Sequence, residues 1–255
     1  MTAVDSASTE PSFRDHFSGR SSSYAEFRPT YPDSLFSFLA DCCSTHNLAW
    51  DCATGNGQAA RALTPYFGRV VASDASNAQI LAADTHPNIE FRIARAEASG
   101  LDDDSIDLIT VAQAAHWFEV SAFLDEAQRV LVSGGVLAIW SYATCLVNEE
   151  CDAVINELYA EIVGPYWPPE RKIVENGYRD IFLPMPLISP PKFAMKIDWM
   201  VEAMLGYLRT WSASQRYLND RGSDPVSRIE GKLRAVWGAG SREVSWPLNL
   251  KIGRA

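Results

Sequence analysis

Between residues 48 and 142, short apolar runs typical of buried strands alternate with segments whose apolar residues recur at helical spacing. A repeated strand–helix–strand pattern predicts a parallel sheet with helices on both faces. We expect the pair Gly134-Gly135 to end the third helix and turn the chain into the fifth strand. The expected strands are Leu48–Cys52, Arg69–Ser73, Ile89–Ile93, Ile106–Ala112 and Val136–Trp140, and the expected helices are Gln58–Tyr66, Ser76–Asp84 and Val120–Leu131.

The segment before this region is expected to contribute a tail and a covering arm. Residues 1–12 are polar and lack the apolar centre of a signal peptide, so we expect a disordered tail there. Residues 13–45 predict an N-terminal helical arm or lid, in which Leu35, Phe36 and Leu39 have helical spacing.

The last third of the chain mixes helices, prolines and two strand-like stretches. Apolar residues at helical spacing predict helices near 151–162 and 200–211. Alternation at 193–197 and 244–252 predicts two late strands, and Pro247 restricts the second to a sheet edge or a bulge. We expect these strands to pair antiparallel at the edge of the main sheet, with the helices over its rim. The nearby methionines, Met195, Met200 and Met204, are expected to fill the core.

These elements predict an α/β domain over residues 46–255: a doubly wound, mainly parallel sheet of seven strands with a late antiparallel strand and a helical cap inserted at about 145–240. Apolar residues make up 47% of the 255, enough for a sizeable core. A net charge of −10 disfavours binding to a nucleic-acid backbone. The five cysteines show no metal-ligand spacing, so we expect no metal site, and we expect reduced thiols in a cytoplasmic location. No stretch approaches the ~18 uncharged apolar residues of a membrane span, so none is expected.

The segment from Asp51 to Ala60, DCATGNGQAA, follows the first expected strand and opens a helix. Gly55 and Gly57 permit positive φ angles and let a ligand approach bare backbone. The amides that follow can donate hydrogen bonds from a helix N-terminus. Ligands of doubly wound sheets bind beyond the strand ends where the strand order reverses. This segment therefore predicts a nucleoside-binding loop.

Two acidic residues refine this hypothesis. Asp74 ends the second expected strand, at an offset suited to a carboxylate that accepts hydrogen bonds from ribose hydroxyls. Asp51 beside the loop disfavours a pyrophosphate and suits an ammonium or sulfonium group, as in S-adenosylmethionine. Alternatively, or in addition, Asp51 accepts hydrogen bonds from loop amides.

At these residues the chain resembles class I S-adenosylmethionine-dependent methyltransferases, which have a Rossmann-like fold. The resemblance is strongest to the small-molecule group that includes trans-aconitate methyltransferase-like and ubiquinone/menaquinone-biosynthesis-like enzymes. One departure is Ala53, where many members have glycine. The resemblance rests on Asp51, Gly55, Gly57 and Asp74, on residues 96–97 and 113–118, and on the segments 24–32 and 207–213.

The resemblance implies the roles of individual residues. Asp51 and the glycine loop would hold the methionine end of the cofactor, Asp74 the ribose, and Glu97 the adenine edge. Glu97 has the alternative reading of a solvated loop acid. The full set of implied cofactor residues is Asp51, Ala53, Gly55, Asn56, Gly57, Gln58, Asp74, Ala75, Ser76, Gln79, Ala96, Glu97 and Gln113.

The acceptor side is less defined by the sequence. His116 follows a central strand and is a candidate catalytic base or acceptor-orienting residue, or else a histidine packed by Trp117 and Phe118. Arg28 is expected either to pair with a carboxylate or to tie the arm to the domain. Trp211 is expected either in the core or in the pocket wall. The candidate lid and pocket residues are Tyr24, Arg28, Tyr31, His116, Trp117, Trp140, Tyr142, Trp211 and Ser212.

The sequence thus predicts methyl transfer from S-adenosylmethionine to a small-molecule acceptor by in-line displacement, with S-adenosylhomocysteine as the product. A carboxylate-bearing acceptor is one candidate. Because the donor is already activated, the protein mainly positions the acceptor and excludes water. The alternatives are a nicotinamide-dependent oxidoreductase with the same loop, and a non-catalytic protein that binds the cofactor. No nucleic-acid or membrane partner is expected.

Overall fold

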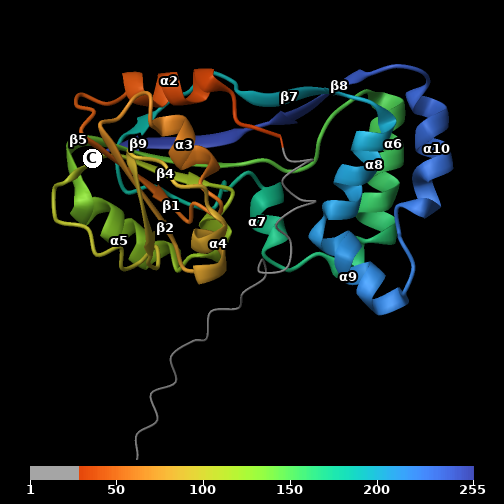
Figure 1. Cartoon of the computed structure of the whole chain (residues 1–255), viewed down its shortest axis with the longest axis horizontal. Helices are drawn as coiled ribbons and strands as arrows, with labels where there is room; N and C mark the ends of the chain where they lie inside the picture. The colour runs from red at the N-terminus through yellow and green to blue at the C-terminus, as the bar shows by residue number, and fades with distance from the viewer. Residues whose placement is uncertain (1–28) are drawn as a thin grey trace, which may run out of the picture.

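The computed structural model describes residues 29–255, and a seven-stranded sheet forms its centre (Figure 1). β9 runs antiparallel to both of its neighbours, β5 and β6, and the other pairs of neighbouring strands are parallel. In spatial order the strands are β3 (Ile89–Ile93), β2 (Arg69–Asp74), β1 (Leu48–Cys52), β4 (Ile106–Ala112), β5 (Leu131–Ser141), β9 (Asn249–Arg254) and β6 (Leu187–Ile188). The predicted fold class, a doubly wound and mainly parallel α/β sheet with a late antiparallel strand, is confirmed.

Helices cover both faces of the sheet because the central strands are apolar on both sides. In β4, Leu108 belongs to the core on one face, and Ile109 and Val111 belong to the core on the other. The helices α2 (Asp33–Asp41) and α3 (Gln58–Leu63) pack on the first face, and α5 (Val120–Val130) packs on the second. The short helix α4 (Asn77–Ala82) follows β2 and buries none of its residues.

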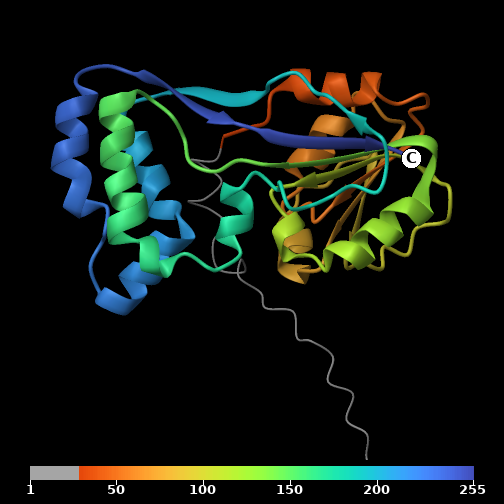
Figure 2. The ribbon, with the colours of Figure 1, turned by 180° about the vertical axis from the view of Figure 1, so that it is seen from behind.

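A separate group of helices lies beyond one end of the sheet, on the right in Figure 1 and on the left in Figure 2. A two-stranded antiparallel ribbon, β7 and β8, leads to and from this group. The short helix α7 lies between the group and the sheet. The elements of this part are α6 (Glu149–Asn156), the π-helical η2 (Glu157–Ile162), η3 (Gly164–Tyr166), α7 (Arg171–Glu175), β7 (Ala194–Trp199), α8 (Val201–Thr210), α9 (Ser212–Arg221), α10 (Ser227–Trp237) and β8 (Arg242–Pro247).

Two expectations about strand boundaries are wrong. The pair Gly134-Gly135 does not end a helix: α5 ends at Val130, and both glycines lie inside β5. The register of β5 on β4 shifts across this stretch, and Gly134 has a φ of +81°, so the glycines form an irregularity within a strand.

The second late strand is two strands. Pro247, which has no N–H to donate, ends β8, and β9 begins two residues later. The expected antiparallel pairing exists between β7 and β8, but in a separate ribbon, whereas β9 enters the main sheet between β5 and β6. Met195 and Met204 are buried as expected, but Met200 is 51% exposed.

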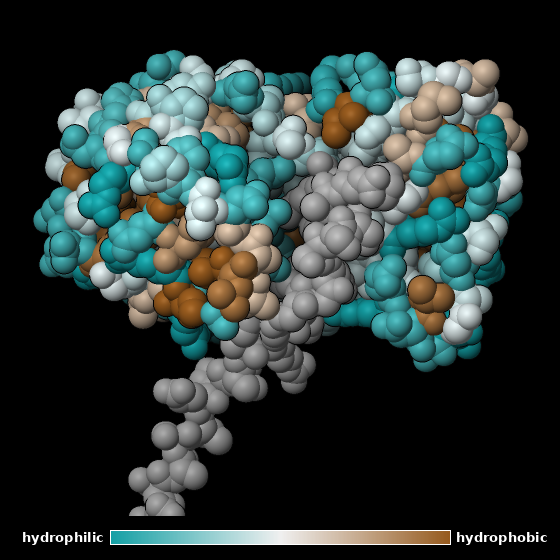
Figure 3. All heavy atoms as spheres, in the orientation of Figure 1, coloured by the Kyte–Doolittle hydropathy of each residue, from teal (hydrophilic) through white to brown (hydrophobic). Residues whose placement is uncertain are grey.

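Most of the visible face is hydrophilic, with smaller hydrophobic areas between (Figure 3). Among residues 29–255, no helix has both the length and the apolar composition that a bilayer span needs. In the same part of the chain, no cluster of three or more His, Cys, Asp or Glu side chains is suited to hold a metal ion.

Candidate active site

The loop between β1 and α3 has a backbone conformation that its glycines allow. Gly55 and Gly57 have φ angles of +59° and +85°. A Cβ atom added to Gly57 would lie 3.0 Å from Cζ of Phe91. Ala53 also has a positive φ, +55°, at the position where the sequence departs from glycine. The loop therefore turns tightly, with Gly57 buried against Phe91 and the backbone of Gly55 half-buried.

Asp51 is buried at the start of this loop, with an exposed fraction of 1%. Its carboxylate accepts hydrogen bonds from the hydroxyls of Thr54 (2.5 Å) and Thr110 (2.8 Å) and from the amide of Ala60 (3.0 Å). Burial raises the pKa of Asp51 to about 6, against the opposing effect of these hydrogen bonds. The contacts give Asp51 the loop-ordering role that the sequence left open.

Asp74, at the end of β2, holds the glycine loop from the other side. Its two carboxylate oxygens accept hydrogen bonds from the amides of Gly55 (2.9 Å) and Ser76 (2.8 Å). Asp74 is half-buried. The hydroxyl of Ser76 is buried and has no hydrogen-bond partner. A donor–acceptor pair thus sits at the end of β2.

Other predicted cofactor residues surround this pair. The side chain of Gln79 approaches Gly55, since a Cβ on the glycine would lie 3.9 Å from the Gln79 Oε1 atom. Gln58 donates a hydrogen bond to the carbonyl of Pro29 (3.2 Å), while its own side-chain oxygen is buried without a partner. The remaining members of this group are Asn56, which is exposed, and Ala75, which is half-buried.

The loop after β3 is fixed by Glu97. One oxygen of Glu97 accepts a hydrogen bond from the amide of Glu119 (2.9 Å), and the other pairs with Arg95 (3.2 Å). Its side chain is 15% exposed, so the reading of a solvated loop acid is wrong. The neighbouring Ala96 is buried in the core.

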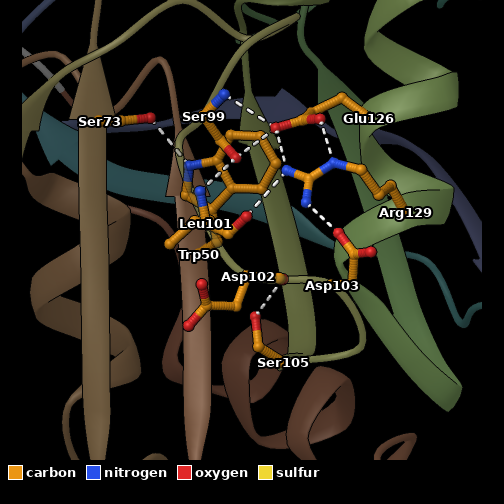
Figure 4. A network of polar contacts seen from close by, with 9 residues as sticks. All are labelled: Trp50, Ser73, Ser99, Leu101, Asp102, Asp103, Ser105, Glu126 and Arg129. Atoms are coloured by element: carbon orange, nitrogen blue, oxygen red, sulfur yellow. Dashed lines mark hydrogen bonds and ion pairs between the residues drawn. The ribbon is translucent and has the colours of Figure 1, made fainter.

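A charged network anchors the same loop to α5 (Figure 4). Glu126 accepts hydrogen bonds from the amide (2.9 Å) and the hydroxyl (2.5 Å) of Ser99. Arg129 donates to Glu126, to Asp103 and to the carbonyl of Leu101 (2.8 Å). The hydrogen bonds from Arg129, followed by those from Ser99, lower the pKa of Glu126 to about 2. The network holds the loop that carries Ala96 and Glu97 in one position.

Gln113 follows β4 with a φ of +57°. Its side-chain amide donates to the carbonyl of Tyr142 (2.9 Å) and accepts from the amide of Tyr142 (2.9 Å). The side chain therefore extends the pairing of β4 with β5 beyond the strand ends.

His116 lies on η1 (Ala115–Trp117), directly after β4. Its Nδ1 atom is 2.8 Å from the hydroxyl of Tyr178. Burial, and secondarily the charge of Arg171, lower the pKa of His116 to about 4, so the ring is neutral at pH 7. Burial raises the pKa of the Tyr178 phenol well above its usual value. A protonated phenol can donate to Nδ1 or accept from Nδ1–H, so the tautomer of the imidazole decides the direction of this hydrogen bond. Trp117 stacks near His116 with ring centroids 4.7 Å apart and is 37% exposed.

The other predicted pocket residues form two groups. Tyr31 and Trp140 are buried and pack edge to face, with ring centroids 5.4 Å apart. Trp211 is buried among aromatic rings of the helical group, and Ser212 is half-buried beside it. The backbone of Tyr142 pairs with Gln113, as described above. Tyr24 and Arg28 lie outside the described residues.

Comparison with known proteins decides the family. Residues 50–139 match the family described as "Methyltransferase domain". A candidate methyltransferase from Dictyostelium discoideum is 37% identical over 229 residues, which cover 88% of this chain and 87% of that protein. The chain belongs to the class I S-adenosylmethionine-dependent methyltransferases. This family assignment favours a methyltransferase over the oxidoreductase that the glycine loop alone also allowed.

Solved structures agree with this assignment. The methyltransferase resembles a candidate type II methyltransferase from Anaeromyxobacter dehalogenans with a TM-score of 0.85 and 40% identity, over 89% of this chain and 97% of that one. The YcgJ protein of Bacillus subtilis shares the fold, with a TM-score of 0.54 and 18% identity over 88% of this chain and 98% of that one.

Sequence reasoning missed several residues that shape the site of this methyltransferase. Glu126 and Arg129 have the i, i+3 spacing of a helical ion pair, a signal that was available. Tyr178 and Arg171 gave no such signal, because only the folded chain brings them to His116, which Tyr178 follows by 62 residues.

Proposed function

We propose that this methyltransferase acts on a small-molecule acceptor bound between the loop after β4 and the helix α7. The observation that carries the proposal is the constellation at the ends of β1 and β2, where a tight glycine loop is fixed by Asp51 and Asp74. The loop leaves the half-buried backbone of Gly55 open to a ligand, whereas Gly57 is buried against Phe91.

The residues present fit S-adenosylmethionine. The buried hydroxyl of Ser76 and the carboxylate of Asp74 are the donor and acceptor types that ribose hydroxyls bind. The half-buried backbone of Gly55 would border the methionine end, and the fixed loop at Ala96 and Glu97 would border the adenine. The cofactor supplies an activated methyl group on a sulfonium, so the protein needs to orient the acceptor and exclude water.

On the acceptor side we propose that His116 orients the acceptor and does not abstract its proton. With a pKa of about 4 it is a weak base at pH 7, and Tyr178 holds its Nδ1 atom. Because Tyr178 bonds to Nδ1, Nε2 is the ring nitrogen that would hydrogen-bond to an acceptor oxygen or nitrogen. The assignment of the chain to the trans-aconitate-like and ubiquinone-like subgroup stays a prediction, as do the cytoplasmic location and the limits of the helical cap.

Titration calorimetry with S-adenosylmethionine, S-adenosylhomocysteine and NADH tests the cofactor. We expect binding of the first two and none of NADH. Incubation of the protein with a small-molecule extract and methyl-labelled cofactor, followed by mass spectrometry, tests the acceptor. We expect label in a small molecule. Failure to bind S-adenosylhomocysteine, or label only in macromolecules, would overturn the proposal.

A further inference from the structure

We propose that Arg171 is the carboxylate-binding residue of the acceptor pocket, so that the acceptor is a small organic acid. This inference rests on the proposed function, because it assumes an acceptor beside His116. Arg171 was not among the candidate site residues that the sequence predicted.

Arg171 is held by aromatic side chains of the helical group. Its Nε atom donates a hydrogen bond to the hydroxyl of Tyr159 (2.8 Å). Its guanidinium carbon lies 4.7 Å from the ring centroid of Trp167 and 5.5 Å from that of Tyr159. Trp211 packs against both rings, with centroids 5.7 and 5.6 Å away. These contacts fix the guanidinium without using its two terminal nitrogens.

The hydrogen-bond partner of Arg171, Tyr159, comes from a π-helix. Tyr159 lies on the π-helical η2, a conformation that often marks functional sites. The carbonyl of Tyr159 accepts a hydrogen bond from the indole N–H of Trp167 (3.1 Å), which orders the ring beneath the guanidinium. Glu175 accepts a hydrogen bond from the hydroxyl of Tyr159 and so reaches Arg171 only through that hydroxyl. In the described part of the chain, no carboxylate forms an ion pair with Arg171.

Arg171 lies on the helix that packs against the proposed acceptor region. It begins α7, which packs against η1, the element that carries His116. The charge of Arg171 contributes to the lowered pKa of His116, so the two groups act on the same region. An acceptor beside His116 would therefore meet both the neutral imidazole and the guanidinium.

The chemistry favours a carboxylate. The two terminal nitrogens of a guanidinium match the two oxygens of a carboxylate in a bidentate pair. A single cation balances a monoanion, whereas a phosphate dianion would call for more positive charge. The protein has a net charge of −10, which repels anions at long range, so an acidic acceptor needs a local cation to bind.

The test uses the full-length protein saturated with S-adenosylhomocysteine and two pairs of probes: benzoate with benzamide, and hexanoate with hexanamide. Ligand-observed NMR titration measures each dissociation constant. For wild type we expect at least one acid to bind about tenfold or more tightly than its amide. Arg171→Gln should abolish that preference. Lys172→Gln, which removes an exposed cation from the same helix, should retain it.

Affinity for S-adenosylhomocysteine is measured for every variant, which separates this inference from the proposed function. Normal cofactor binding by Arg171→Gln shows that the variant is folded. If neither acid binds more tightly than its amide, or if the preference survives in Arg171→Gln, the assignment of Arg171 is wrong. Failure of wild type to bind S-adenosylhomocysteine would instead overturn the proposed function. Tyr159→Phe is a second variant, expected to weaken the preference without removing the charge.

Discussion

The two sides of the site are built differently. On the cofactor side, the carboxylates of Asp51 and Asp74 fix backbone, because they accept hydrogen bonds from amides and hydroxyls of the loop that they border. On the acceptor side, long side chains support one another: Tyr178 holds His116, and aromatic rings hold Arg171.

The difference suggests how specificity is divided. A ligand that is recognised by backbone needs the loop to have one shape, and small residues and carboxylates provide it. A ligand that is recognised by side chains depends on residue identity, which can change without altering the sheet. We therefore expect substitutions on the cofactor side to affect S-adenosylhomocysteine binding, and those on the acceptor side to leave it intact.

The largest effect is expected for Gly57→Val. A β-branched residue opposes a φ of +85°, and its Cβ would lie within 3.0 Å of Phe91. We expect roughly a 100-fold or greater loss of S-adenosylhomocysteine affinity by calorimetry. Gly231→Ala is the control, because a Cβ there meets open space. Unchanged affinity in a folded Gly57→Val protein would remove the loop from the cofactor site.

Asp74→Ala should have the next largest effect. It removes the acceptor of the Gly55 amide and the carboxylate proposed to bind the ribose. A charge-assisted hydrogen bond contributes ~1.5–3 kcal/mol, so we expect a loss of affinity of about tenfold or more. Asp84→Ala, at a side chain that is 91% exposed, is the matched control and should bind normally. Equal affinities in the two variants would contradict the ribose assignment.

The sequence predicted the cofactor side better than the acceptor side for a physical reason. The loop lies within a short stretch of chain, and Asp74 follows at a fixed offset, so strand and helix rules locate both. His116 was found as a strand-end residue, but its partner Tyr178 lies 62 residues away and carries no local pattern. Arg171 was missed because the rings that hold it, Tyr159 on η2 and Trp167 after η3, come together only in the folded chain.

The same distinction explains the errors in the fold. Alternation across Pro247 is continuous in the sequence, yet the chain leaves the ribbon there and enters the main sheet. Apolar periodicity indicates which face of a strand or helix is buried, but it does not indicate which element that face packs against. The mainly parallel, doubly wound sheet, by contrast, followed from the strand–helix repeat.

The network at the loop after β3 should affect stability more than binding. The pKa of Glu126 is about 2 in the folded protein, which is below its pKa in the unfolded chain. Ionised Glu126 therefore stabilises the fold at pH values above the unfolded-state pKa. This stability is lost as pH falls from about 4.5 to about 2. We expect Glu126→Gln to lower the free energy of unfolding at pH 7 by about 1–2 kcal/mol, allowing for solvent screening at Arg129.

Denaturant unfolding at several pH values measures this effect. The difference between wild type and Glu126→Gln should shrink toward acid pH. Glu90→Gln is the control, because its pair with Arg92 lies on the surface. A loss no larger in Glu126→Gln than in Glu90→Gln would mean that the network does not stabilise the loop.

The smallest effect concerns the link between Arg171 and His116. Burial is the main cause of the lowered pKa of His116, and the positive charge of Arg171 is the second. Arg171→Gln should therefore raise the pKa of His116, because a neutral side chain no longer opposes the imidazolium. The rise should be smaller than the lowering that burial causes. NMR titration of labelled histidine measures the midpoint, with Lys172→Gln as the control. A midpoint that is the same in both variants would place Arg171 too far from His116 for one acceptor to contact both.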